Sequence, residues 1–231
     1  MDEKRITSAR VGTQFVLVLM AVVFLVGFIQ VSGDRADERT ALQMILADLE
    51  TDSVELTAQL NRGHRTERGA MWILRNIDRD VPVDSVIGGL TPLFYYTAYE
   101  QVQAGYLNLL YAGRLTVISD PELRQGVVDY FERTHPYMWQ FYALYMDIYK
   151  EFKETTAPYM RFVPEPEGDV FVQNFHTEMV RPWNEMKVDT RFLYKLEELG
   201  AAGSQFGIRL GPALERNAEL RAAIRQELGM E

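Results

Sequence analysis

The chain has 231 residues, contains no cysteine and carries a formal net charge of −9 at pH 7. Its length suffices for one domain with a hydrophobic core, and the lack of cysteine excludes a disulfide framework. The first ten residues contribute +1, so the remainder carries −10. That charge argues against nucleic acid or anionic lipid headgroups as the main partners.

The first predicted element is a membrane anchor over residues 11–32. No charged residue occurs from Val11 to Val31, and a helix of about 21 residues is about 30 Å long, which matches the hydrocarbon core of a bilayer. The residues expected to insert include Phe15, Leu17, Leu19, Phe24, Leu25 and Phe28. A cleaved signal peptide is the alternative, but the apolar run is long for one and no clean cleavage site follows it.

The distribution of basic residues predicts the orientation of this anchor. Three basic residues occur within the first ten positions, whereas the two that closely follow the anchor are interleaved with acidic residues. The positive-inside rule therefore places residues 1–10 in the cytoplasm and residues 33–231 outside it. We expect the protein in a bacterial inner (plasma) membrane, with the bulk of the chain periplasmic.

From Asp37 to about residue 80 the sequence predicts one long helix, because apolar residues recur at intervals of three and four. The apolar seam comprises Leu42, Ile45, Leu46, Leu49, Leu56 and Leu60. This seam fits either packing within the chain or a dimeric coiled coil. Gly63, His64 and Glu67 interrupt it, which favours packing within the chain.

The rest of the chain predicts further helices joined by short links. They are expected over residues 94–111, 120–131, 137–155 and 190–228, after a short apolar stretch at 85–93. Gly113 suits a left-handed residue at the end of the first, and Asp120 followed by Pro121 is a typical helix start. Pro136 is expected to kink or break the chain.

Residues 158–172 are the least helical part, because they combine several prolines with a glycine. They predict a loop, with room for one short strand at 170–172. A single strand makes no sheet, so the expected fold class is all-α. The predicted architecture is one N-terminal transmembrane helix followed by an extracytoplasmic helical bundle over residues 33–231.

Three stretches carry a resemblance to a known family. They are the junction Asp37-Glu38-Arg39 with Leu46-x-Asp48-Leu49 after it, the segment Tyr106-x-x-Leu109-x-x-x-Gly113-x-Leu115-x-x-Ile118 leading into Ser119-Asp120-Pro121, and the closing helix Leu220 to Leu228. In this order and spacing they resemble an uncharacterised bacterial family, a domain of unknown function, of single-pass membrane proteins with a helical extracytoplasmic domain. The resemblance implies architecture and location, and it passes on no catalytic residue.

No pattern of catalytic or metal-binding residues is present in the sequence. His64, His135 and His176 do not pair at metal-ligand spacing. Gly203-Ser204 lacks the spacing of a nucleophile elbow, and no glycine loop precedes a Lys-Ser/Thr pair. We therefore expect a non-enzymatic protein with no catalytic residue, no metal site and no cofactor.

Three glycines in the last predicted helix form a candidate close-packing face. Gly203, Gly207 and Gly211 stand four residues apart, so a continuous helix would place them on one side, where another backbone could approach. The alternative is that these glycines and Pro212 break the segment into two helices, since glycine costs about 1 kcal/mol in a helix. Both readings remain open at the level of sequence.

Aromatic residues are unusually dense between residues 95 and 152. The candidate surface for a partner or ligand comprises Tyr106, Tyr137, Trp139, Tyr142, Tyr145 and Tyr149. A helix that is apolar on all sides must be buried, so the competing interpretation is the central helix of a bundle. Tyrosine and tryptophan also suit protein interfaces and membrane surfaces.

The sequence predicts a membrane-anchored domain that mediates protein–protein interaction. We expect an accessory or structural subunit of a larger membrane complex. Respiratory and photosynthetic complexes are among the candidates. Its partners would be other subunits or a second copy of the chain. The alternative is a ligand-sensing or small-molecule-binding bundle. A partner role predicts an exposed apolar aromatic patch, whereas a ligand role predicts an enclosed pocket lined by Tyr106, Tyr142 or Tyr145. A third alternative, a hydrolase or metal enzyme, predicts histidines and carboxylates that converge in the fold.

Overall fold

The structure is a computed structural model that describes residues 3–94, 99–164 and 175–230. Side chains are described from residue 35 onward, except at positions 162, 164, 175 and 176 of a hairpin. The predicted anchor residues Phe15, Leu17, Leu19, Phe24, Leu25 and Phe28 therefore lie outside the described side chains. Among the residues whose side chains are described, which begin at residue 35, no helix combines the length and the apolar character that crossing a bilayer requires.

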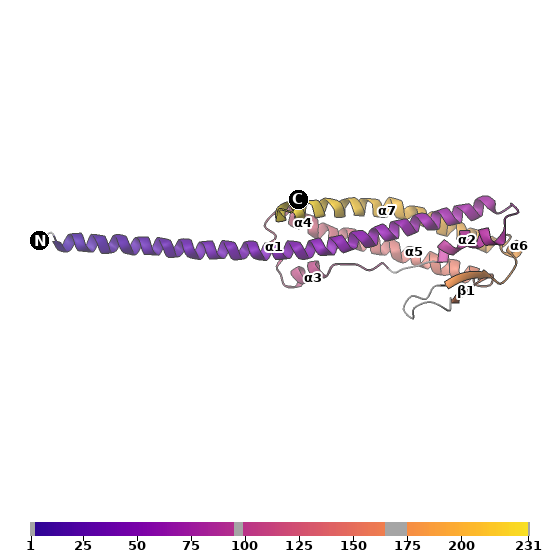
Figure 1. The fold of residues 1–231 in the computed structure, drawn as a ribbon, viewed down its shortest axis with the longest axis horizontal. Coiled ribbons are helices and arrows are strands. Elements are labelled where there is room, and N and C mark those ends of the chain that lie inside the picture. The colour runs from indigo at the N-terminus through magenta and orange to yellow at the C-terminus, as the bar shows by residue number, and fades with distance from the viewer. Residues whose placement is uncertain (1–2, 95–98, 165–174, 231) are drawn as a thin grey trace.

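The molecule is mostly helical, as predicted, and its long helices run side by side. Helix α1 (Glu3–Asn76) extends along the whole bundle, and in Figure 1 its N-terminal part projects well beyond it. Helices α5 (His135–Thr156) and α7 (Thr190–Leu228) pack along each other, and α7 packs along α1. The shorter elements are α2 (Val83–Phe94), α3 (Ala104–Tyr111), η1 (Leu115–Val117), α4 (Pro121–Asp129), η2 (Tyr130–Thr134) and α6 (Trp183–Met186).

Capping residues set several helix ends where the sequence indicates them. The Asp120 carboxylate accepts hydrogen bonds from the backbone N–H of Glu122 (2.8 Å) and Leu123 (3.1 Å), and Pro121 occupies the first turn of α4. Asp189 caps α7 in the same way. Gly113 has φ +66°, so the predicted left-handed turn after α3 is confirmed.

The predicted helix at 94–111 is wrong in its extent. Residues 83–94 already form α2, residues 99–103 are not helical, and α3 begins only at Ala104. Pro92 lies inside α2, where its missing N–H and its ring weaken a helix. The burial of Val86, Leu90 and Leu93 against the core compensates for that cost.

The chain does not break at Pro136. Between α4 and α5 the backbone widens into the π-helical turn η2, in which the N–H of His135 bonds the carbonyl of Tyr130. Pro136 lies in the first turn of α5, where its lack of an N–H costs nothing. The wide turn thus takes up the proline without interrupting the helical path.

The all-α expectation also needs one correction. Strands β1 (Met160–Pro164) and β2 (Phe175–Met179) form an antiparallel pair in which Met160 is opposite Met179 and Phe162 opposite Thr177. Sequence analysis placed a loop over the first strand and missed the second, because five residues are too few for a clear alternation. The strand proposed at 170–172 lies outside the described residues.

Glycine allows the backbones of α1 and α7 to approach each other closely where the two helices cross. A Cβ added at Gly203 would lie 2.9 Å from the N of Glu67 and 2.9 Å from the O of Gly63, both on the α1 backbone. At Gly207 the nearest atom is His64 Nε2 at 3.4 Å, and at Gly211 nothing lies within 4 Å. Helix α7 is continuous through Pro212, so the reading in which glycines and Pro212 break the segment is wrong, and the close contact is made at Gly203.

This crossing predicts opposite effects for two glycine substitutions in α7. Gly203→Ala forces two backbones apart and should lower the free energy of unfolding by about 1–3 kcal/mol. Gly211→Ala meets open space and should leave stability unchanged or raise it by up to about 1 kcal/mol through helix propensity. Urea unfolding of the full chain, followed by circular dichroism, measures both, and equal effects of the two substitutions would contradict the assigned crossing.

Candidate functional site

Six polar residues form a buried layer across the bundle, which we call the polar layer: Asp48, Asp52, Tyr99, Tyr130, His135 and Asn217. It separates two apolar clusters. Along α1 the chain passes from Leu49 in one cluster to Leu56 in the other, with Asp52 between them. The same change of cluster occurs around His135, at the start of α5, and around Asn217 in α7.

Asp52 is the centre of the polar layer and is fully buried. Its Oδ1 accepts a hydrogen bond from the Tyr99 hydroxyl at 3.0 Å, and its Oδ2 accepts one from the Tyr130 hydroxyl. Tyr130 in turn accepts a bond of 3.0 Å from Asn217 Nδ2. A buried carboxylate is tolerated only when donors surround it, and here they come from segments far apart in the sequence.

His135, the residue that follows the π-helical turn, completes the surroundings of Asp52. It is fully buried, and its Nε2 lies 3.1 Å from Asp52 Oδ2. The ring is not aligned for a hydrogen bond to that oxygen, and Nδ1 meets no hydrogen-bond partner among the described residues. His135 is therefore close to Asp52 without a hydrogen bond to it. Aromatic side chains, including those of Tyr99 and Phe131, surround the imidazole.

Burial changes the protonation of the residues in and beside this layer. It raises the pKa of the Asp48 carboxyl, although hydrogen bonds from the backbone N–H of Tyr106 and Gly105 oppose the rise. Burial is also the largest cause that raises the pKa of Tyr99 and Tyr130, and the neighbouring Asp52 adds to it. Both hydroxyls are therefore held in the protonated form, as donors to Asp52.

The polar layer contains residue types that are found in catalytic sites, but solvent and substrate cannot reach them. A carboxylate beside a histidine is the arrangement of a general base and its orienting group. Here Asp52, His135 and Tyr130 are all sealed from solvent, and none lines either of the two cavities described below. No cluster of three potential metal ligands occurs within the described part of the chain. The layer is best interpreted as a part of the core that holds the helices together.

A groove of about 520 Å³ lies beside the polar layer, between η2 with the start of α5 on one side and α7 on the other. The surface of the groove is mainly apolar and includes two arginines. The lining residues are Arg133, Thr134, Tyr137, Met138, Ile208, Arg209, Pro212 and Ala213. The guanidinium of Arg209 lies 5.6 Å from the centre of the Tyr137 ring. Tyr137 and Ile208 are 45% and 64% exposed, so the groove presents apolar surface to solvent.

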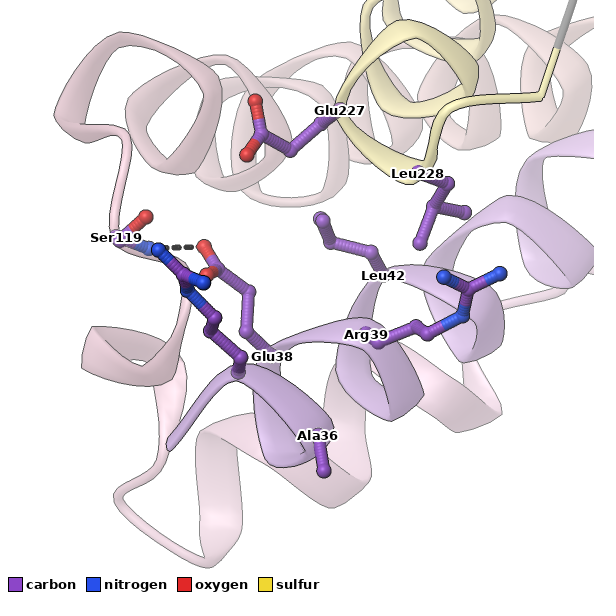
Figure 2. Close-up of a pocket in the computed structure, with 8 residues that line it drawn as sticks. Ala36, Glu38, Arg39, Leu42, Ser119, Glu227 and Leu228 are labelled. Atoms are coloured by element: carbon purple, nitrogen blue, oxygen red, sulfur yellow. Dashed lines mark hydrogen bonds between the residues drawn. The ribbon is translucent and has the colours of Figure 1, made fainter. Parts of the chain in front are cut away.

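A second cavity, of about 580 Å³, lies at the end of the bundle from which the N-terminal part of α1 projects. Figure 2 shows Glu38 of α1 pointing toward Ser119 and Leu42 lying near Leu228 at the end of α7, with Arg39 extending on the other side of Leu42. The Glu38 carboxylate accepts a hydrogen bond of 2.6 Å from the backbone N–H of Ser119, which precedes α4. Charged side chains of both signs thus meet at this cavity, which we call the basal pocket.

The predicted aromatic surface divides into two sets. Tyr137 and Trp139 are exposed, at 45% and 49%. The other four, Tyr106, Tyr142, Tyr145 and Tyr149, are buried in the clusters of the core. Hydrogen bonds position three of the buried hydroxyls: Tyr106 bonds Glu132 at 2.8 Å, Tyr149 bonds the carbonyl of Phe94 at 2.7 Å, and Tyr145 lies 3.3 Å from the Thr66 hydroxyl.

Sequence reasoning missed the polar layer. Asp52, Tyr130 and Asn217 were not singled out, and His135 was considered only as a metal ligand. A signal was present, because Asp48 and Asp52 stand four apart and continue the apolar seam of Ile45, Leu49 and Leu56. A carboxylate on the apolar face of a helix must be buried with partners.

Comparisons with family models, with curated proteins and with solved structures found no match to this chain. The resemblance described above therefore stays an interpretation of the sequence, and the functional argument depends on the geometry of the groove.

The protonated tyrosines of the polar layer predict how stability depends on pH. Tyr99 and Tyr130 ionise near pH 10 in the unfolded chain, but their pKa is raised in the folded one. Their contribution is therefore fully present below pH 10 and is lost as the pH rises above it, at up to about 1.4 kcal/mol per pH unit for each tyrosine.

The test compares the slopes of unfolding free energy between pH 9 and 11, roughly the range in which tyrosine ionises. The double variant Tyr99→Phe, Tyr130→Phe should show a flatter slope than the parent chain, whatever its stability at pH 7. The matched control, Tyr111→Phe with Tyr194→Phe, removes two exposed hydroxyls and should keep the parent slope. A parent slope in the polar-layer variant would contradict the assigned protonation.

Proposed function

We propose that this chain is a non-enzymatic, membrane-anchored helical domain that binds another protein outside the cytoplasm. In this proposal the uncharged run at residues 11–31 anchors it in a bacterial inner membrane. The helical bundle would then serve as an accessory or structural subunit of a larger membrane complex. The resemblance to a family of single-pass membrane proteins supports the same architecture.

The observation that carries the proposal is the groove between α5 and α7. It combines exposed apolar side chains with two arginines, and Trp139, 49% exposed, follows on α5. Interfaces are enriched in Tyr, Trp, Met and Arg, and hot spots form where such side chains line pockets. Exposed tryptophan and isoleucine would stay in contact with water in the absence of a partner.

The competing ligand-binding function depended on an enclosed pocket lined by Tyr106, Tyr142 or Tyr145. Those three side chains fill the core, and neither the groove nor the basal pocket is lined by them. The described geometry therefore favours a protein partner at the groove.

The test is extraction of native membranes with mild detergent, followed by native mass spectrometry of the species that contain the chain. We expect a stoichiometric complex with at least one other protein. Ile208→Glu places a charge in the groove and should lower the occupancy of the partner by tenfold or more, as about 1.4 kcal/mol or more of lost binding does. Val54→Glu introduces the same charge at an exposed position of α1 that lines neither cavity, and it should leave the complex intact.

A chain that is recovered alone, or only as a homo-oligomer whose stability Ile208→Glu does not change, would contradict the proposal. Equal losses of partner in Ile208→Glu and Val54→Glu would place the interface elsewhere.

A further inference from the structure

Four apolar side chains of α5 continue the groove along the bundle. They recur at intervals of four, three and four residues, so they lie on one face of the helix. Tyr137 and Leu144 are exposed, Leu144 by 60%, while Phe141 and Ile148 are partly buried. The set, which we call the α5 stripe, comprises Tyr137, Phe141, Leu144 and Ile148.

The α5 stripe borders α7. The rings of Phe141 and of Phe206 in α7 have their centres 5.1 Å apart, and the Arg209 guanidinium lies over Tyr137. Ile208 of α7 lines the groove at the same level and is largely exposed. An apolar strip thus runs beside α7 for about 17 Å, the length of the stripe. Apolar surface of this kind stays in contact with water unless another element covers it.

One end of the stripe is basic. Arg133 and Arg209 line the groove there, and both are exposed. Asp129 lies 3.4 Å from Arg133, whereas Arg209 forms no ion pair within the described part of the chain. A positive charge is therefore in excess at this end, in a chain whose net charge is −9.

The other end of the stripe is acidic. Glu151 follows Ile148 on the same face of α5, and Glu198 comes from α7. Both carboxylates accept hydrogen bonds from the ammonium group of Lys195, which lies between them and is mostly buried. Two carboxylates around one ammonium leave a negative charge in excess within this cluster. The two ends are about 21 Å apart, which is the rise along α5 from Tyr137 to Glu151.

A helix is the element that fits this surface. Side chains spaced three and four residues apart on another helix can enter the spaces between those of α5 and α7, as the helices of a bundle do. A strand would find no backbone partner here, because α5 and α7 use their N–H and C=O groups within the helix.

A second copy of the chain does not fit this charge pattern when both copies are anchored in one membrane. A twofold axis along the bundle would place Arg209 against Arg209 and Glu151 against Glu151, so that like charges meet. Turning one copy end over end would bring opposite charges together. The N-terminal parts of α1 would then project in opposite directions from the pair (Figure 1). The helix that covers the stripe must therefore come from another protein.

We propose that the α5 stripe and the groove together bind one amphipathic helix of the partner protein. Apolar residues of that helix, three and four apart, contact Ile208 and the stripe. A carboxylate side chain at one end contacts Arg133 and Arg209, and a basic side chain about 14 residues away contacts Glu151. The inference rests on the proposed function, because it names the kind of segment that the groove receives.

The experiment places the photoreactive residue p-benzoylphenylalanine at position Leu144, Ile148 or Ile208 of the full chain, one at a time, and irradiates native membranes. Mass spectrometry maps each cross-link on the partner. We expect all three positions to label one continuous segment of one protein, in the order Ile208, Leu144, Ile148. The outer two labels should lie about 10 residues apart, because Ile208 lines the groove beside Met138. The control position Val54, exposed on α1, should not label that segment.

Charge reversal tests the basic end of the stripe. In R133E/R209E a carboxylate of the partner helix would meet two carboxylates, so the occupancy of the partner in native mass spectrometry should fall by about tenfold or more. The control R65E/R68E reverses two exposed arginines of α1 that line neither the groove nor the basal pocket, and it should leave the occupancy unchanged.

Cross-links that fall on separate segments of the partner, or on a second copy of the chain, would overturn the inference. Equal occupancy in R133E/R209E and its control would also overturn it. Failure of the inference is distinguishable from failure of the proposed function. If native membranes contain no complex, both are wrong. If a complex forms and Ile208→Glu disrupts it, but positions Leu144 and Ile148 label nothing in the partner, only the helix assignment is wrong.

Discussion

The buried carboxylate of Asp52 is the constraint on which the arrangement of the helices depends. A charge sealed from water is stable only when its donors are held in place, and loss of one partner of such a group costs about 3–5 kcal/mol. Its donors come from Tyr99, before α3, and from Tyr130, in the π-helical turn, with His135 beside them and Asn217 of α7 bonded to Tyr130. A shift of one helix along another would separate these groups, so the layer fixes the register that apolar packing alone leaves loose.

The same constraint positions the groove that carries the proposed function. The π-helical turn that brings Tyr130 and His135 to Asp52 also provides Arg133 and Thr134 to the groove. On α7, Asn217 in the polar layer lies four residues beyond Ala213 in the groove. The basal pocket lies where the end of α7 meets α1. In this account the interior is a rigid support for the groove at the side of the bundle.

Local signals in the sequence predicted individual helices and turns, but they predicted few of the tertiary features of the fold. The long helix through Leu42 and Leu56, the cap at Asp120 and the turn at Gly113 each follow from neighbouring residues, and the structure has them. The division of residues 83–111 into two helices, the π-helical turn and the hairpin depend on contacts between distant segments. For the same reason the aromatic residues could not be sorted from sequence: Tyr137 and Trp139 differ from Tyr142 and Tyr145 only in which side of α5 faces the core. The polar layer could have been suspected from Asp48 and Asp52 on an apolar face, but its partners could not.

The most direct test of the account is the unfolding free energy of Asp52→Asn, with amide hydrogen exchange across η2 and α7. The substitution keeps the shape of the side chain but removes its charge and one acceptor, and so leaves a buried donor unpaired. We predict a loss of about 3 kcal/mol or more, with faster exchange in Tyr130–Thr134 and around Asn217. Asp147→Asn, an exposed aspartate of α5, should change stability by less than about 0.5 kcal/mol. An Asp52→Asn chain as stable as that control, with unchanged exchange in η2, would contradict the central role of the polar layer.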